Sequence, residues 1–203
     1  MLSKSPFILL VNASLGVNSM AELLALARSK PGMLNYGTTG IGAGPYLAAQ
    51  MMIAATKIDA RHIPFNGSAP LLTALLGNVV DFGFGDPTAL PSIRAGSLKA
   101  LGVTSLKRSP ILPDVPTFDE TIKKGFDMAN WCSILAPANT PPEIVKFINE
   151  SIAKALKSPD LLRVFEAQGF EPVSSNPEEL RSFMVSEIKK YHDVLEAAGV
   201  KPQ

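Results

Sequence analysis

The sequence predicts an α/β fold in which a lobe with a mostly parallel sheet precedes a helix-rich second half. Between Phe7 and Thr104, short apolar segments alternate with segments whose apolar residues recur at helical spacing. Strands that alternate with helices are typical of βαβ units and a parallel sheet. The length of 203 residues gives room for one large domain or two small lobes. We therefore expect a central α/β lobe over residues 12–104.

The elements of this first half follow one another closely. The apolar N-terminal segment predicts a buried strand, and Ser19 with Glu22 predicts a capping box that opens a helix ended by Pro31 and Gly32. A helical segment starts at Asp86 and ends near Gly96. The other expected strands are 33–36, 59–65, 79–84 and 98–104, and the other expected helices are 45–56 and 69–76.

The second half contains mainly helices. Residues 106–125 are rich in proline, which fits either an ordered crossover or a flexible linker, and residues 131–137 predict a strand. Helices are predicted to start at a Thr140–Glu143 capping box, at Ser158 and at an Asn176–Glu179 capping box. The apolar faces of these helices must pack against a sheet to be buried. Either they cover the first lobe, or their sheet lies in residues outside this chain.

Composition excludes several classes of protein. The net charge is +1 and the Lys and Arg residues are dispersed, which argues against nucleic-acid binding. The only cysteine, Cys132, allows no intramolecular disulfide and no multi-cysteine metal site. The N-terminal apolar run is too short for a signal peptide, and no run approaches the roughly 18 residues of a membrane span. We predict no metal and no cofactor.

No catalytic constellation is present, and we predict that the chain is not an enzyme. The sequence contains neither a Gly-x-Ser-x-Gly nor a His-Glu-x-x-His motif. His62 follows the second expected helix and is predicted to be a hydrogen-bonded core or cleft histidine, while His192 belongs to the solvated face of the last helix. No general base with a plausible partner emerges, so no catalytic residue is assigned.

The glycine-rich segment Gly37–Gly44 is the most informative part of the chain. It follows a strand and opens a helix, so unpaired backbone N–H groups and the helix dipole converge there and favour an anion. It lacks the lysine of a phosphate-binding P-loop. Asn66 stands near the place where a dinucleotide site needs an acidic residue. A phosphate or carboxylate site and a plain tight turn both remain open.

Two more polar, glycine-containing loops, 65–70 and 83–88, follow later strands. Ser68 and Thr88 lie near helix starts, and Asp86 is a predicted N-cap. Because the carboxyl ends of parallel strands meet at one edge of a sheet, we expect all three loops to lie there together. That arrangement predicts a ligand cleft.

Several motifs resemble one family in combination. These are Lys30-Pro-Gly-Met-Leu-Asn-Tyr-Gly-Thr-Thr-Gly40, His62-Ile-Pro-Phe-Asn-Gly-Ser-Ala-Pro70, Leu101-Gly-Val-Thr-Ser-Leu-Lys-Arg-Ser-Pro110, Leu112-Pro-Asp-Val-Pro-Thr117 and Leu135-Ala-Pro-Ala-Asn-Thr-Pro141. Together, from about residue 5 to 198, they resemble the tripartite tricarboxylate transporter receptors, the Bug-type (TctC-like) periplasmic substrate-binding proteins.

The resemblance implies a periplasmic-binding-protein-like fold of type II, a Venus flytrap whose two α/β lobes close on a carboxylate. It implies a periplasmic protein that passes its solute to the membrane subunits of a tripartite tricarboxylate-type transporter. Candidate ligands are di- or tricarboxylates, aromatic carboxylates and acidic amino acids. The ligand contacts implied are Thr38, Thr39, Gly40, Gly42, Ala43, Asn66, Gly67, Ser68, Ala69 and Asp86.

The sequence departs from this family at its start. Family members begin with a signal peptide and a strand–loop–helix that forms the opposite jaw, and the resemblance implies that this chain begins after them. We therefore expect one complete lobe and part of the other, the latter made of a hinge strand (1–11) and residues 105–203. Two alternatives stay open. One is a small α/β enzyme that uses the Gly37–Gly44 loop as an anion cradle, and the other is a non-binding remnant that self-associates through its incomplete lobe.

Overall fold

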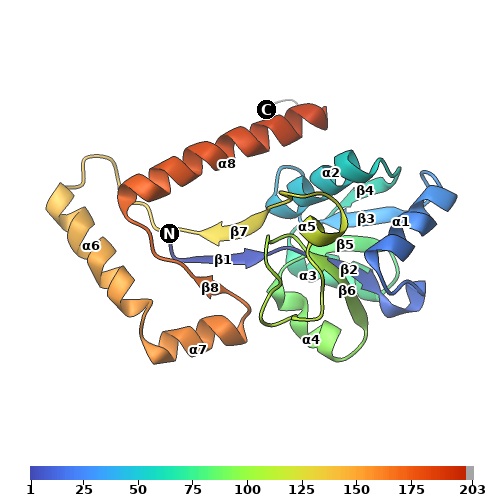
Figure 1. Ribbon diagram of the computed structural model, residues 1–203, viewed down its shortest axis with the longest axis horizontal. Helices are drawn as coiled ribbons and strands as arrows, with labels where there is room; N and C mark the ends of the chain where they lie inside the picture. Colours follow the sequence, from blue (N-terminus) through green and yellow to red (C-terminus); the bar gives the residue numbers. More distant parts are fainter. Residues whose placement is uncertain (200–203) are drawn as a thin grey trace.

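The structure, a computed structural model, describes residues 1–199 and contains two sheets (Figure 1). The five-stranded sheet has the order β4-β3-β5-β2-β6 and the three-stranded sheet the order β7-β1-β8. The strands are β1 (Ser3–Pro6), β2 (Ile8–Asn12), β3 (Asn35–Thr38), β4 (Arg61–Pro64), β5 (Phe82–Gly85), β6 (Leu98–Val103), β7 (Ala129–Cys132) and β8 (Glu171–Pro172).

Helices connect and cover these strands. In chain order they are η1 (Ala13–Leu15), α1 (Met20–Ser29), α2 (Gly44–Thr56), α3 (Ser68–Leu76), η2 (Pro87–Ala89), α4 (Leu90–Arg94), α5 (Phe118–Thr121), α6 (Pro142–Ala155), α7 (Pro159–Ala167) and α8 (Pro177–Ala197). We call β2–β6 with α1–α5 the large-sheet region, and β1, β7 and β8 with α6–α8 the small-sheet region. No helix within residues 1–199 is both long and apolar enough to cross a membrane.

The larger sheet is mostly parallel, as predicted, with one reversed strand. β3 pairs in parallel with β4 and β5, whereas β2 is antiparallel to both of its neighbours, β5 and β6. β6 consequently runs in the same direction as β5. The reversal follows from chain entry: β2 continues from β1 after the single residue Phe7, so it approaches the sheet from the opposite side.

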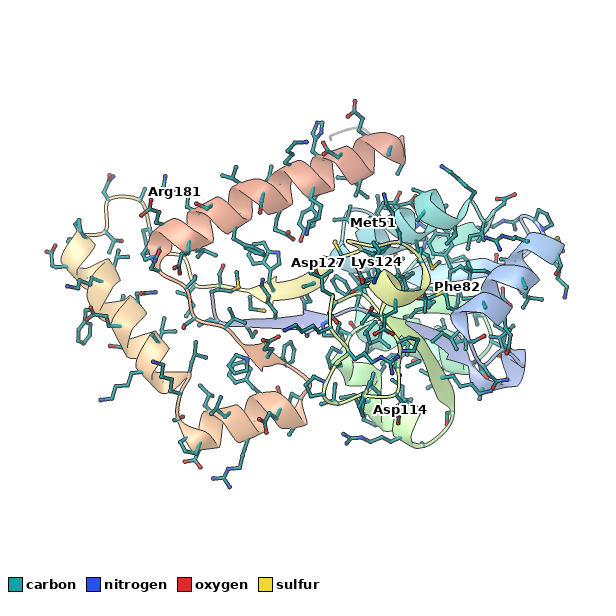
Figure 2. All side chains as sticks on the ribbon, viewed as in Figure 1. Met51, Phe82, Asp114, Lys124, Asp127 and Arg181 are labelled. Carbon is teal, nitrogen blue, oxygen red and sulfur yellow. The ribbon has the colours of Figure 1, made fainter. Side chains whose placement is uncertain are left out.

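Each face of the larger sheet carries its own core. Side chains of alternate residues on a strand point to opposite faces, so Leu9 and Val11 of β2 pack with α1 and α2, while Ile8 and Leu10 pack with α3 and α4. Phe82 lies among the strands of this sheet and is completely buried (Figure 2). The large-sheet region therefore has a continuous apolar interior on both sides.

The proline-rich segment after β6 is ordered. Of the two alternatives for residues 106–125, this favours an ordered crossover over a flexible linker. Arg108 donates to both carboxylate oxygens of Glu120, with N···O distances from 2.9 to 3.2 Å. Phe118 of α5 packs edge-on against Phe84 and Phe126, with ring centroids 5.8 and 4.9 Å away. Residues 112–126 thus add to the core of the large-sheet region.

The chain passes between the two sheets at Phe7 and near Asp127 and Met128 (Figure 2). Thr104, at the end of β6, joins both passages. Its hydroxyl accepts a bond from the Phe7 N–H (2.9 Å) and donates one to the Met128 carbonyl (2.6 Å). Its backbone carbonyl accepts from the Met128 N–H at 3.0 Å. Thr104 is fully buried, so these bonds are shielded from water.

The small-sheet region is covered much less completely. α6, α7 and α8 frame its three short strands (Figure 1), and α8 extends across to pack against α2. Trp131 of β7 donates its indole N–H to the Tyr191 hydroxyl of α8 at 3.1 Å. No residue of α6 or α7 is buried, and Phe147 of α6 is 70% exposed. The apolar stripes predicted for these helices form, but they are only partly covered.

Several local predictions need correction. Ser19 caps α1, but Glu22 accepts from the Asn18 N–H rather than completing the box on Ser19. Thr140 does not cap α6, whose N-cap is Pro141, because its hydroxyl donates to the Pro137 carbonyl instead. The capping box at Asn176 and Glu179 is confirmed.

Two strands also differ from expectation. β5 begins at Phe82, three residues after the predicted start, because residues 77–81 are occupied by the turn that ends α3. β7 spans Ala129–Cys132 rather than 131–137, because its ladder with β1 ends at the pair Ser3 and Cys132. Cys132 lies on this strand but is exposed.

Candidate functional site

The three polar loops lie at one edge of the larger sheet. In the parallel register, Gly37 of β3 is level with Ile63 of β4 and with Gly83 of β5. Each strand ends one or two residues later, and the chain turns there into α2, α3 and η2 respectively. The prediction that these loops share an edge is confirmed, and the reason is the parallel order β4-β3-β5.

The loop between β3 and α2 presents backbone donors. Gly40 and Gly42 have φ values of +127° and +81°, which a side chain would strain. Among residues 1–199, the N–H groups of Ile41, Gly42 and Gly44 have no acceptor. Pro45 fills the first turn of α2, and the N-cap Ala43 offers no side-chain bond. A helix start without its own cap leaves these donors to a ligand.

Gly44 allows this loop to approach the passage between the sheets. A Cβ atom at Gly44 would lie 2.4 Å from Cζ of Phe7, far inside van der Waals contact. The start of α2 therefore rests directly on the aromatic ring that separates β1 from β2.

Asp86 joins the second and third loops. Its carboxylate accepts from the Ser68 hydroxyl at 2.7 Å, from the Thr88 N–H at 2.9 Å and from the Thr88 hydroxyl. Asp86 thus caps η2, as predicted, and also holds the start of α3. In this structure its oxygens serve the loops themselves, and Asn66 and Ala69 are exposed beside them.

Gly67 provides the turn into α3. Its φ of +102° places it in the region that favours glycine, and a Cβ there would meet nothing within 4 Å. The residue is required by backbone conformation rather than by close packing.

Thr38 occupies a different place from the one its predicted role suggests. It is fully buried, and its hydroxyl lies 2.7 Å from Nε2 of His62. The same oxygen accepts a longer bond, 3.4 Å, from the Gly40 N–H. Its side chain therefore organises the loop, whereas Thr39, Gly40, Gly42 and Ala43 are at least partly accessible. The assignment of all ten predicted residues as ligand contacts stays a prediction.

An aromatic group beside the loop was not predicted from the sequence. His62 lies between the rings of Tyr36 and Tyr46, each with its centroid 5.0 Å away. Burial lowers the pKa of His62 and raises the pKa of Tyr36 to about 12. This grouping could have been inferred from the parallel register. Tyr36 and Thr38 point to the same face of β3, and Tyr36 is level with His62 of β4.

The structure also contains a separate cavity of about 680 Å³ where the two regions meet. Lys4, Arg108, Phe170 and Lys190 are among its lining residues, and none of the predicted ligand residues lines it. No group of three or more His, Cys, Asp or Glu side chains that could hold a metal occurs in the described part of the chain.

Comparison with known proteins identifies the family. The family model described as "Tripartite tricarboxylate transporter family receptor" matches residues 1–200. The chain belongs to this receptor family. Curated relatives of the receptor are 29–33% identical to it over 94–100% of its length. The chain spans only 57–63% of the length of those relatives.

Solved structures agree with this receptor fold. Rpa4515 of R. palustris with adipate superposes with a TM-score of 0.92 at 32% identity, over 100% of this chain and 68% of that one. The periplasmic binding protein BugD gives 0.88 at 30%, over 100% and 69%. MatC of Rhodopseudomonas palustris with bound malate gives 0.81 at 28%, over 95% and 67%. This chain thus has the periplasmic-binding-protein-like α/β fold, and its family and fold are those of solute-binding proteins.

Proposed function

We propose that this chain captures a small organic carboxylate and performs no catalysis. The candidate ligands are a di- or tricarboxylate, an aromatic carboxylate or an acidic amino acid. Membership of the receptor family supports a binding role, and adipate and malate are the molecules named with two structural neighbours. His62, the only histidine of the large-sheet region, is already bonded to a buried threonine, which gives the enzyme alternative no free base.

The observation that carries this proposal is the set of unpaired N–H groups at Ile41, Gly42 and Gly44. They stand at the start of α2, a helix of 13 residues, where the helix dipole favours negative charge. No lysine or arginine lies between Thr38 and Thr56. A site built from backbone dipoles suits the diffuse charge of a carboxylate and fixes its orientation without a counter-ion.

The same proposal extends to the architecture and the partners. Residues 12–104 would form the central ligand-binding lobe, and residues 1–11 with 105–203 would form a hinge strand and part of the other lobe. Strand β2, at residues 8–12, already lies in the larger sheet, so the division would fall within Ser5–Phe7. The proposal includes a periplasmic location and delivery of the solute to the membrane subunits of a tripartite tricarboxylate-type transporter, and family membership supports both.

Isothermal titration calorimetry tests the binding role. The 203-residue chain is titrated with adipate, malate, citrate, benzoate and glutamate, and we expect saturable heat with at least one of them. Absence of heat with every member of this panel would contradict the proposal for the chain as it stands. A measurement at two salt concentrations then separates a buried carboxylate contact, which is weakly screened, from surface attraction.

Two glycine variants provide matched evidence for the site. Gly42→Ala and Gly96→Ala both place a Cβ at positive φ, +81° and +72°, with nothing within 4 Å. Both should cost a similar amount of stability, about 1 kcal/mol. Only Gly42→Ala should weaken the carboxylate heat, since Gly96 lies between α4 and β6. Equal loss in both variants would place the ligand elsewhere.

A further inference from the structure

His62 is held in a defined position by three elements of the large-sheet region. It lies on β4, level with Tyr36 of the neighbouring β3, and Tyr46 of α2 approaches from the other side. Tyr36 itself is fixed by stacking on Phe82, at a centroid distance of 5.5 Å, and by a bond from Gln50 to its hydroxyl at 2.9 Å. The imidazole therefore has little freedom to reorient.

From this position His62 reaches the glycine-rich loop through one hydroxyl. Nε2 of His62 lies 2.7 Å from Oγ1 of Thr38, and the same oxygen accepts from the Gly40 N–H at 3.4 Å. The Thr38 side chain is fully buried. In this scheme a ligand contacts only the accessible part of the loop, after Thr38. The Thr38 hydroxyl contacts the loop on its buried side, at the Gly40 N–H.

The segment that depends on this bond is the one with unusual backbone geometry. Gly40, two residues after Thr38, has a φ of +127°, and the unpaired N–H groups of Ile41 and Gly42 follow it. A small change in the orientation of Thr38 would rotate the Gly40 peptide and redirect those donors. Binding sites made of backbone donors depend strongly on such alignment.

We propose that His62 is a positioning residue that sets the conformation of the Thr38–Gly42 loop through the Thr38 hydroxyl, and thereby sets affinity for a carboxylate. The second part rests on the proposed function. The first part concerns the ligand-free chain and stands without it. His62 touches no ligand in this scheme, which distinguishes it from the loop residues assigned as contacts.

The charge state of the imidazole gives this role a pH dependence. Tyr36 on β3 and Tyr46 on α2 face His62, and burial raises the pKa of both, so neither offers an anion. Arg61, its neighbour on β4, is a cation, and Gln50 of α2 is neutral. Burial lowers the pKa of His62 itself. Acidification should therefore place a positive charge beside the loop and strengthen the binding of an ionised carboxylate.

Three variants test the proposal. His62→Phe keeps an aromatic ring and removes the nitrogen, while His62→Gln keeps a polar group that can bond to Thr38. His192→Phe is the matched control, because His192 is the other histidine and is exposed on α8. The amide resonances and hydrogen-exchange protection of Gly40 and Gly42 are recorded by ¹⁵N NMR without ligand, and adipate and malate affinities are measured by calorimetry.

We expect His62→Phe to shift the Gly40 amide, reduce its protection and weaken the carboxylate that binds by about tenfold, the loss of one buried hydrogen bond. His62→Gln should recover most of both effects but should lack the acid-dependent gain of affinity. His192→Phe should change neither. If His62→Phe leaves the Gly40 amide and the affinity unchanged, the proposal is wrong.

A second variant protects the test against a folding defect. Thr38→Val removes the hydroxyl from the other side of the bond and should shift the Gly40 amide at least as much, because it also removes the acceptor of that N–H. Adding His62→Phe to Thr38→Val should change the Gly40 amide no further, because the hydroxyl through which His62 acts is already absent. Additive shifts would contradict the link. If the parent chain binds no carboxylate, the proposed function fails, and the ligand-free amides still decide whether His62 positions the loop.

Discussion

The large-sheet and small-sheet regions contain helices of opposite character. α2 buries six residues against the larger sheet although its apolar side chains extend almost all round it. α6 and α7 are much more clearly amphipathic, yet neither buries a residue in the described chain. A strong apolar stripe shows that a helix is suited to packing. It does not show that the packing partner is present, which depends on the rest of the fold.

The largest expected contrast is between two phenylalanines. Phe82→Ala removes a fully buried side chain and should lower the free energy of unfolding by about 3–5 kcal/mol, from lost burial and a new cavity. Phe147→Ala, on α6, should change it by less than about 0.5 kcal/mol. Urea titration of each variant gives both values. A large cost at Phe147 would show that α6 is covered in solution.

The next contrast concerns close packing at the start of α2. Gly44→Ala forces a Cβ against the Phe7 ring and should cost about 1–3 kcal/mol through overpacking. Adding Phe7→Leu should return part of that loss, because the smaller side chain leaves room. Thermal unfolding of the single and double variants measures the effect. A full, unrelieved cost in the double variant would assign the penalty to backbone strain instead.

A smaller effect tests the hydrogen bonds that join α8 to β7 in the small-sheet region. Tyr191→Phe removes the hydroxyl that accepts from Trp131 and donates to Glu187, a side chain that is itself buried. We expect a loss of about 1 kcal/mol in the free energy of unfolding. Lys189→Ala, two residues earlier on the exposed face of α8, is the control. Equal values for the two variants would mean that α8 is only loosely attached to β7.

The smallest effect is the dependence of stability on pH through His62. Its pKa is lowered in the folded chain, so between that value and the unfolded value of about 6.5 the unfolded chain binds more protons. Stability from this group should be complete above about pH 6.5 and should fall as the pH drops through the folded pKa. Denaturant midpoints from pH 5 to 8 in the parent chain and in His62→Gln check this, and identical slopes would contradict it.

The large-sheet region was predicted well from the sequence because the patterns that predict it involve residues close together in the chain. Strand–helix alternation predicts a parallel sheet, and glycine-rich strand–helix turns predict polar loops at one edge, both of which the structure confirms. The reversed direction of β2 was not predicted, since it depends on the chain entering from the other sheet. The failure of the Thr140 cap has a local cause, the competing Pro137 carbonyl, which pattern matching does not weigh.

The candidate site was predicted by position more than by role. The loops come together as expected, but the buried state of Thr38 depends on His62, which lies 24 residues away on a neighbouring strand. Asp86 was predicted as a cap, and its bond to Ser68 of another loop was not. Such links follow from register, which requires the paired strands to be known first.

Thr104 has a mechanical consequence. The chain passes between the sheets at Phe7 and at Met128, and both residues are hydrogen-bonded to this one buried threonine. Turning one sheet against the other about that point would leave these short bonds intact, whereas sliding the strands lengthwise would break them together. The two sheets should therefore rotate relative to each other more easily than they slide past each other. Because the Phe7 ring also packs against Gly44, Phe7 and the first turn of α2 should move together when the sheets rotate.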